Sequence, residues 1–237
     1  MRRSDRFLAA LAIASLGLSL GAPGAQADHV YELPVWFTWD TAKLDVLVLG
    51  TVDPLFGNAI LDALQSWKRG IAQLAPPWLQ SELEIRALIP GIWGGPDPGF
   101  EAHDVEIFVV PQGLMAFHPC FVEVTCPTGK YCVAFAPTQR PTEGRDDLYK
   151  VALHEIGHCL GLDHVFHNNV EYSPAFDPMG SGFGSPRPCP SNLNALALER
   201  VFGGLLGRES GGTVTISASD YRQSNCGSAA HWPPPLP

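Results

Sequence analysis

Residues 154–164 of this chain are HEIGHCLGLDH, and the interpretation of the whole sequence starts from this stretch. His154 and His158 are four residues apart, so on a helix their side chains project from one face, one turn above the other. Two imidazoles in that position can bind one metal ion at about 2.0–2.1 Å. Gly161 can adopt the positive φ that ends a helix, and the turn then returns His164 to the same ion. The stretch therefore predicts three histidine ligands.

The residue after the first histidine indicates what such a site would do. Three protein nitrogens leave one position of a tetrahedral zinc ion open for water, which distinguishes a catalytic site from a structural one. Glu155 can reach a water molecule at the ion without binding the metal itself. A zinc ion lowers the pKa of that water towards ~7 and polarises a carbonyl group. Glu155 is thus the candidate general base, which takes the proton and delivers it to a leaving amine.

Two other interpretations fit the stretch less well. In the first, the histidines only satisfy hydrogen bonds inside a buried helix, which would not require three of them at ligand spacing. In the second, a fourth side chain closes a structural zinc site, and Cys159 is the nearest candidate. Cys159 adjoins His158 and points about 100° away round the helix, so it cannot share the ion. A catalytic zinc site is therefore favoured.

The pattern HExxHxxGxxH followed by a methionine turn is that of the metzincin clan of zinc endopeptidases. The chain resembles this clan, and VALHEIGHCLGLDH is most similar to the matrixin branch in its secreted bacterial form. The methionine turn would be Asp177-Pro178-Met179-Gly180, with Met179 as an apolar floor beneath the zinc site and not as a ligand. The resemblance implies an α+β, zincin-like fold, with a twisted mixed sheet, two long helices and a smaller C-terminal subdomain below a zinc cleft.

The resemblance also implies a function. The protein would be a zinc endopeptidase that hydrolyses peptide bonds of a protein or peptide substrate, with one catalytic Zn²⁺ held by His154, His158 and His164. Two alternatives stay open: a zincin-fold binding or adhesion module with little proteolysis, and a zinc hydrolase of another amide or ester bond. The intact Glu155 argues against the first alternative, because a pure binding site needs no general base.

Several positions depart from the family's pattern. Where some metzincins place a tyrosine, two residues after the methionine, this chain has Ser181. A second, structural zinc has no matching ligand set, since His103 and His118 alone are weak candidates, and no calcium-binding loop is visible although calcium is common in the family. We expect His167 to be a solvated loop residue rather than a ligand. There is no room for an inhibitory pro-domain between residue 28 and the first strand, so we expect release in active form or restraint by a separate partner.

The N-terminus has the three parts of a secretory signal peptide over residues 1–27. Three arginines among the first six residues are followed by the apolar run 7–20 and by the small-residue cleavage site Ala25-Gln26-Ala27. The apolar run is too short to be a convincing membrane span. We therefore expect a secreted protein, extracellular or periplasmic, that has no membrane segment after cleavage.

The remaining residues suit one domain with a sizeable core. We expect a catalytic domain over residues 28–204 and an unassigned C-terminal extension over residues 205–237, with a short strand at Thr213–Ser217. The formal net charge of the chain is −9, which excludes the basic footprint of a nucleic-acid-binding protein. We expect a monomer.

All six cysteines follow the predicted signal peptide, which indicates disulfides formed in an oxidising compartment. They are Cys120, Cys126, Cys132, Cys159, Cys189 and Cys226. Six cysteines allow 15 connectivities, and the sequence does not choose among them, although the first three could contain a local pair. A cysteine metal site is disfavoured because the spacings match no zinc ribbon. We expect Cys159 to be bridged rather than reactive.

Hydrophobic periodicity predicts the remaining elements. Strands are expected at Val35–Trp39, Leu44–Leu49, Leu83–Ile89, Val105–Val110 and Tyr131–Ala136, with a long loop over Pro111–Lys130. One helix should begin at Asp53-Pro54 and end before Pro76-Pro77, and the zinc helix should run from a cap at Asp146 or Asp147 to about Leu160. A last helix should be capped by Ser191 and stopped by Gly203-Gly204. In the family, an edge strand beside the cleft pairs with the substrate backbone, and by position that strand would be Tyr131–Ala136.

Overall fold

The computed structural model of the protein describes residues 29–49, 54–88, 105–109, 119–120, 131–135, 145–167, 170–171, 177–180 and 188–226. The predicted signal peptide, His103, His118, Cys126, Ser181 and residues 227–237 lie outside the described residues.

The larger sheet has five strands in the order β3-β2-β4-β6-β5. They are β2 (Lys43–Leu49), β3 (Glu84–Leu88), β4 (Val105–Val109), β5 (Pro119–Cys120) and β6 (Tyr131–Phe135). The first four in that order are parallel, and β5 is antiparallel to β6. Parallel neighbours need crossover connections, which helices supply. The expected mixed sheet is therefore confirmed, and the predicted strands agree with β2, β3, β4 and β6 to within two residues.

The edge of this sheet differs from the expectation. The prediction that Tyr131–Ala136 forms the edge strand is wrong, because β5 lies outside β6, with Pro119 opposite Val133 and Cys120 opposite Cys132. The pairing was missed because a strand of two residues is too short to produce the alternation that identifies strands. Within the described part of the sheet, β5 holds the edge position.

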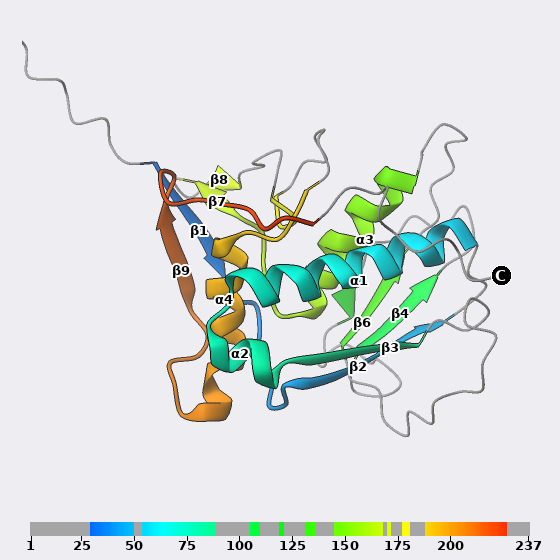
Figure 1. Ribbon diagram of the computed structural model, residues 1–237, viewed down its shortest axis with the longest axis horizontal. Coiled ribbons are helices and arrows are strands. Elements are labelled where there is room, and N and C mark those ends of the chain that lie inside the picture. The colour runs from blue at the N-terminus through cyan, green and yellow to red at the C-terminus, as the bar shows by residue number, and fades with distance from the viewer. Residues whose placement is uncertain are drawn as a thin grey trace, which may run out of the picture.

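Two long helices pack together over this sheet, α1 (Pro54–Leu74) and α3 (Arg145–Cys159) (Figure 1). Their contact is centred on Trp67 of α1, which is fully buried and whose indole N–H donates to the Leu153 carbonyl of α3 at 2.9 Å. The zinc helix predicted from the sequence is α3, which begins one or two residues before the expected cap. A burial of this kind is worth several kcal/mol, so the two helices form one rigid layer.

The segment after α1 contains a helix that was not expected. α1 ends at Leu74, before Pro76-Pro77 as predicted, but Pro77 then begins the short helix α2 (Pro77–Glu82). Proline is tolerated at the first helical position because its missing N–H has no partner there. The same residue therefore stops one helix and starts the next.

A second, antiparallel sheet brings segments far apart in the sequence together, in the order β8-β7-β1-β9. Its strands are β1 (Val30–Pro34), β7 (Phe166–His167), β8 (Val170–Glu171) and β9 (Thr213–Ser217). The strand predicted at Thr213–Ser217 is confirmed as β9, which pairs with the whole of β1. Residues 213–217 are thus part of the fold.

The first strand lies earlier than predicted. The expectation of a strand at Val35–Trp39 is wrong, because β1 ends at Pro34 and Val35 makes only an isolated bridge to Leu162. Trp36, Phe37 and Trp39 are partly buried against the core instead. Aromatic residues favour strands because their side chains pack well on the surface of a sheet. Here the aromatic side chains pack against the core, but their backbone forms no strand pairing.

The last helix, α4 (Asn192–Phe202), lies between the antiparallel sheet and α1 (Figure 1). Ser191 is its N-cap, as predicted, and forms a capping box with Asn194. α4 is followed by a 3-10 turn over Gly203–Leu206 and by Gly207 at a φ of 64°. The helix therefore ends at the expected pair of glycines.

One disulfide joins Cys189, before α4, to Cys226, after β9. Cys159 forms no disulfide and is only 2% exposed, so the expectation that it is bridged is wrong. The reason is geometric, because Cys159 ends α3 inside the core, where the described residues place no second cysteine within bonding distance.

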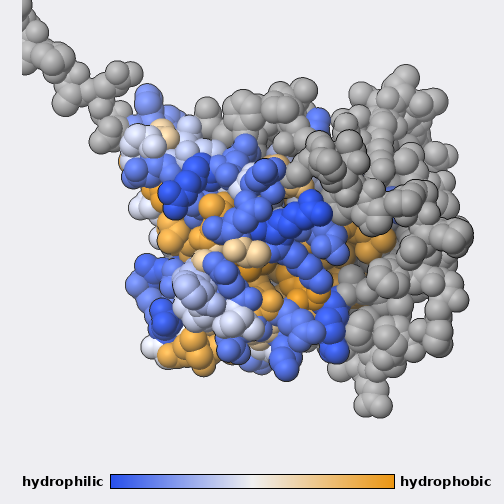
Figure 2. Space-filling view, viewed as in Figure 1, coloured by the Kyte–Doolittle hydropathy of each residue, from blue (hydrophilic) through white to orange (hydrophobic). Residues whose placement is uncertain are grey.

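The described surface of the face seen in Figure 2 is mainly hydrophilic, with a hydrophobic patch at the lower left, where Figure 1 places the turn after α4. Two of the exposed large hydrophobic residues, Leu205 and Leu206, belong to this turn. Among the described helices, none combines the length and the apolar character that a membrane crossing requires.

Replacing both Cys189 and Cys226 by serine should destabilise the protein without changing its fold. The bridge spans 37 residues, and closing a loop of that length restricts the unfolded chain enough to stabilise the native state by roughly 3–4 kcal/mol. Urea unfolding followed by circular dichroism measures the difference. The variant Cys159→Ala is the control, because it removes a thiol that forms no bridge, and an equal loss in both proteins would contradict the prediction.

Candidate metal centre

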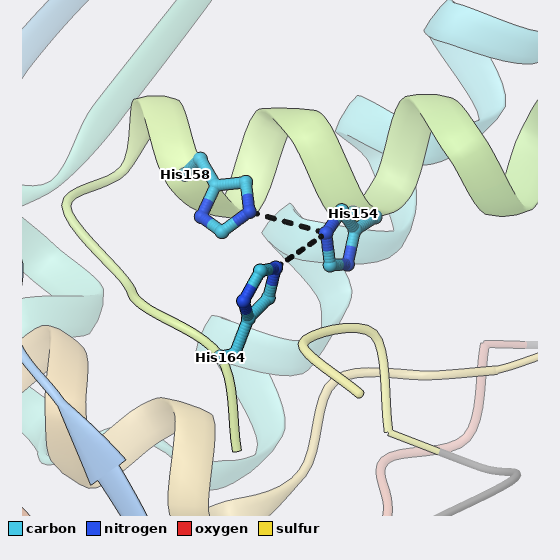
Figure 3. Close-up of side chains that lie close together, drawn as sticks. All are labelled: His154, His158 and His164. Atoms are coloured by element: carbon cyan, nitrogen blue, oxygen red, sulfur yellow. Dashed lines mark hydrogen bonds between the residues drawn. The ribbon is translucent and has the colours of Figure 1, made fainter. Parts of the chain in front are cut away.

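The three predicted ligands converge in the structure, and they are the one group of described residues that could hold a metal ion (Figure 3). His154 and His158 project from one face of α3 and are each 6% exposed. His164 comes from the segment after the helix and points back at them. Its Nε2 lies 3.2 Å from Nε2 of His154, which is itself 3.1 Å from Nε2 of His158.

Gly161 makes the return of the chain possible. Its φ is 95°, which confirms the positive φ expected at the end of the helix. A Cβ atom at this position would lie 2.6 Å from the carbonyl oxygen of Phe37 and 3.1 Å from the side chain of Val201. Glycine is therefore required here both for the backbone conformation and for the close approach of two neighbouring elements.

Two backbone carbonyls fix the tautomers of the helical ligands. Nδ1 of His154 lies 2.7 Å from the Pro178 carbonyl oxygen, and Nδ1 of His158 lies 2.7 Å from the Leu162 carbonyl oxygen. A carbonyl oxygen can only accept, so each Nδ1 carries the proton and each Nε2 keeps a free lone pair. Such carbonyl partners orient metal-binding histidines in other proteins.

The contact between the two Nε2 atoms is then a contact between two lone pairs. It cannot be a hydrogen bond, because neither atom has a proton to donate, and at 3.1 Å the two lone pairs repel each other. A cation between the nitrogens reverses the sign of this interaction. Tetrahedral zinc at about 2.0–2.1 Å from each ligand separates them by about 3.3–3.4 Å. The donor set therefore fits a zinc ion.

Burial keeps the helical ligands in the form that binds metal. Burial and, to a smaller extent, the nearby imidazoles lower the pKa of His154 to about 4 and that of His158 to about 3. Hydrogen bonds to the Pro178 and Leu162 carbonyls oppose the shift. Both imidazoles are thus neutral at neutral pH, as a metal ligand must be.

Glu155 lies next to His154 on α3 and is 7% exposed. Burial raises the pKa of its carboxyl to about 7 in the metal-free protein. Within the described part of the chain no hydrogen bond or ion pair engages this carboxyl. Its lone pairs are therefore available for a proton, and a pKa near neutrality suits a group that accepts and returns one.

The turn at residues 177–180 packs beneath α3. Met179 is fully buried, and its Sδ lies so close to Gly157 that a Cβ atom there would overlap it. Trp67 approaches the same point, 2.9 Å from the position of that Cβ. Gly157 lies between His154 and His158 in sequence, so the methionine supports the helix at the level of both ligands.

The other residues that were considered as possible ligands do not belong to the group of three histidines. Nε2 of His167 is 3.0 Å from Nδ1 of His29 at the surface of the antiparallel sheet, and neither belongs to the metal-binding group. Cys159 is buried in the core. His103, His118 and Ser181 fall outside the described residues.

The sequence profile of the matrixin family matches residues 48–179, which is more than half of the chain. The chain belongs to the matrixin family. Matrixins are zinc metallopeptidases, and their α+β, zincin-like fold agrees with the architecture described above. The resemblance predicted from residues 148–180 is therefore confirmed.

Two solved structures of myroilysin are similar to this matrixin. In the first, 13% of residues are identical over 56% of this chain and 54% of the myroilysin chain, with a TM-score of 0.36. In the second, 13% are identical over 54% of this chain and 46% of the myroilysin chain, with a TM-score of 0.34. The matrixin thus spans about half the length of the solved chains that it matches. No curated protein matches its sequence significantly.

Three partners of the ligands in this matrixin were missed by the sequence analysis. They are the carbonyl groups of Pro178 and Leu162 and the ring of Trp36, which meets the His158 ring edge-on at 5.3 Å. Backbone carbonyls are the same in every residue type, so no sequence pattern marks the two that are used. The position of Gly157 between the ligands was the one available signal of a close neighbour.

Replacing Gly157 by alanine should weaken metal binding by the matrixin. Alanine favours a helix by about 1 kcal/mol over glycine, but overlap with Met179 costs about 1–3 kcal/mol and displaces the turn. We expect zinc affinity to fall roughly tenfold, measured by competition with a chromophoric chelator. Gly204→Ala is the matched control, because a Cβ there meets its nearest neighbour at 3.4 Å. Unchanged affinity in Gly157→Ala would contradict the packing described here.

The stability of the metal-free matrixin should depend on pH through the buried histidines. Both imidazoles have a pKa of 6.5 when unfolded, so between pH 6.5 and 4 the unfolded chain binds more protons. The free energy of unfolding therefore falls as the pH is lowered, by about 1.4 kcal/mol per histidine and pH unit. The raised pKa of Glu155 acts in the opposite direction from pH 7 to 4.5, because the folded state then holds the extra proton.

As the pH falls from 6.5 towards 4.5, the free energy of unfolding of the wild type should decrease by about 1.4 kcal/mol per pH unit, because Glu155 offsets one of the two histidines. In Glu155→Gln this offset is absent, so the free energy of unfolding should decrease about twice as steeply with pH. Urea unfolding in the presence of a chelator, from pH 6.5 to 5, measures both slopes. Equal slopes for the two proteins would show that Glu155 does not hold the extra proton.

Proposed function

We propose that this protein is a secreted zinc-dependent endopeptidase that cleaves protein or peptide substrates. The observation that carries the proposal is the convergence of three imidazole Nε2 atoms, two of them kept unprotonated by backbone carbonyls at Nδ1, next in the chain to the buried carboxyl group of Glu155. Membership of the matrixin family supports the same activity. The two alternatives, a binding module and a hydrolase of another bond, predict different results for the wild type and Glu155→Gln.

In the proposed site His154, His158 and His164 hold the zinc ion through Nε2. When bound, zinc supplies Lewis-acid chemistry, polarising a carbonyl group and lowering the pKa of a water molecule towards ~7. The chain contributes the geometry, because the Pro178 and Leu162 carbonyls hold the two helical imidazoles in place. A ligand that is already oriented loses little entropy when the metal binds.

Glu155 is the proposed general base and acid. It accepts a proton from the attacking water and returns it to the leaving amine nitrogen, so the carboxyl is restored at the end of each turnover. The low exposure of Glu155 supports this role, because a carboxyl with few water neighbours exchanges its proton with the substrate rather than with solvent. Met179 acts as the apolar support of the helix and takes no part in proton transfer.

The substrate would lie along the edge of the larger sheet. An extended peptide can add to an exposed sheet edge through backbone hydrogen bonds, which gives affinity without requiring one sequence. β5 holds that edge in the described sheet, so we assign it the role that the sequence analysis gave to Tyr131–Ala136.

Secretion is proposed from the sequence of residues 1–27 and is supported by the disulfide between Cys189 and Cys226, a bond that persists in oxidising compartments. We propose that the catalytic domain begins near residue 28. β9 pairs with β1, so residues 205–226 of the extension contribute to the same folded unit. Zinc is the one cofactor proposed, and the protein is proposed to act as a monomer.

Replacing Glu155 by glutamine should abolish cleavage while zinc stays bound. Loss of a general base lowers kcat by roughly 10²–10⁴-fold, whereas the three ligands are untouched. Cleavage of casein by the mature chain is measured together with the zinc content of each protein. Glu84→Gln, an exposed change on β3, is the matched control and should behave as the wild type.

The outcomes separate the three functions. Zinc in both proteins and cleavage by the wild type alone support the endopeptidase. Zinc in both and cleavage by neither favours the binding module, while turnover of small amides or esters without cleavage of casein favours a different hydrolase. A folded wild type that binds no zinc would refute the proposal.

A further inference from the structure

Asp177, the first residue of the turn that carries Met179, is a buried carboxylate surrounded by four hydrogen-bond donors. Oδ1 accepts from the Met179 N–H at 2.9 Å and from the Asn194 side-chain amide at 3.1 Å. Oδ2 accepts from the hydroxyl groups of Ser191 at 2.7 Å and Tyr221 at 2.8 Å. A carboxylate has about four acceptor positions, so all of them are used.

The charge of Asp177 is balanced by these donors alone, because no cationic side chain among the described residues pairs with it. Burial raises the pKa of the Asp177 carboxyl, and the four hydrogen bonds oppose that shift. Loss of any donor leaves a buried oxygen under-satisfied, which costs about 1–3 kcal/mol or forces the carboxylate to move. The position of Asp177 is therefore sensitive to each of its partners.

The three side-chain donors all come from the segment that follows the turn. Ser191 and Asn194 belong to the capping box of α4, and Tyr221 follows β9. All three lie inside the loop closed by the disulfide from Cys189 to Cys226. The bridge thus restricts the freedom of the same segment that holds the carboxylate.

Asp177 connects this segment to the ligands. The next residue in the turn, Pro178, supplies the carbonyl that accepts from Nδ1 of His154. The residue after that, Met179, donates its N–H to Asp177 and packs against Gly157 of the zinc helix. A displacement of Asp177 therefore displaces both supports of the site.

We propose that Tyr221 is a positioning residue for the zinc site, acting through Asp177 on the turn at residues 177–180. The proposal rests on the zinc-dependent function proposed above. The Tyr221 ring is held edge-on by Tyr31 at 5.4 Å, so its hydroxyl is fixed where it meets Oδ2. Through Tyr221, residues 205–226 thereby set the geometry of a site formed by α3 and the turn. The sequence had indicated no role for these residues beyond a short strand.

Tyr221 is the one side-chain donor to Asp177 that lies outside the capping box of α4. Ser191 and Asn194 also cap α4, so their replacement changes a helix as well as the carboxylate. The hydroxyl of Tyr221 belongs to the segment after β9, takes no part in the capping box and bonds to Oδ2 of Asp177 at 2.8 Å. Removing it changes the surroundings of Asp177 and leaves both members of the capping box in place.

The first experiment compares Tyr221→Phe with the wild type as purified zinc protein. We expect the zinc dissociation constant, measured by chelator competition, to rise roughly 3- to 10-fold, because partners beyond the ligands tune metal affinity. We expect kcat for a peptide substrate to fall by a similar factor while KM stays within twofold, since the sheet edge is unchanged. The cobalt-substituted protein should show a shifted visible absorption spectrum, which reports ligand geometry directly.

Tyr149→Phe is the matched control. Its hydroxyl is also buried and also bonds across elements, to Ser66 and to the Pro188 carbonyl at 3.0 Å each, but it does not contact Asp177. This variant should lose stability to urea and keep the zinc affinity and cobalt spectrum of the wild type. A Tyr221→Phe protein that loses only stability, as Tyr149→Phe does, would overturn the proposal.

If Tyr221→Phe does not fold, Ser191→Ala provides a second comparison, because its hydroxyl donates to the same oxygen of Asp177. The accompanying loss of the α4 cap is measured separately, as reduced stability to urea. Raised zinc dissociation in that variant supports the positioning role of the carboxylate, and wild-type affinity overturns it. A wild type that binds zinc without cleaving peptides would refute the proposed function alone, since the affinity and the spectrum still decide the role of Tyr221. A wild type that binds no zinc would overturn both.

Discussion

Three imidazole rings that converge on one point, with the Nε2 lone pairs of His154 and His158 facing each other, are the constraint on which the rest of this structure depends. Such an arrangement is unfavourable by itself, because it combines the burial of polar atoms with mutual repulsion. The fold imposes it through the helical spacing of His154 and His158 and through carbonyl groups that accept hydrogen bonds from Nδ1–H of each ring. Only a cation makes it favourable, so metal binding and the stability of the fold are coupled.

Close packing around α3 follows from the same constraint. The zinc helix is approached by Met179 and Trp67 on one side, at Gly157, and by the backbone of Phe37 where it ends, at Gly161. Each glycine lowers helix propensity or adopts a conformation that other residues avoid. The burial of Trp67 and the neighbouring core outweighs these costs, because aromatic side chains contribute the largest buried areas in a core.

The C-terminal part of the described chain, from Cys189 to Cys226, holds the turn at residues 177–180 in place. β9 pairs with β1 near the start of the described chain, and the disulfide joins the segment before α4 to the segment after β9. The three side-chain donors to Asp177 all lie within that closed loop. A buried anion held by four neutral donors is a rigid connection here, since the donors come from the turn itself, from the start of α4 and from the segment after β9.

The sequence by itself determined the ligands, the candidate base, the methionine turn, most strands of the larger sheet and the caps of the helices. These features are local, because helical spacing, proline and glycine act within a few residues. It did not determine the edge strand β5, the place of β1, the unbridged state of Cys159, or the carboxylate network. Those depend on contacts between residues that are far apart in the sequence, such as Cys120 with Cys132, Asp177 with Tyr221 and Val30 with Ser217. Only the tertiary structure decided them, because a hydrogen bond between distant residues leaves no periodic signal in the chain.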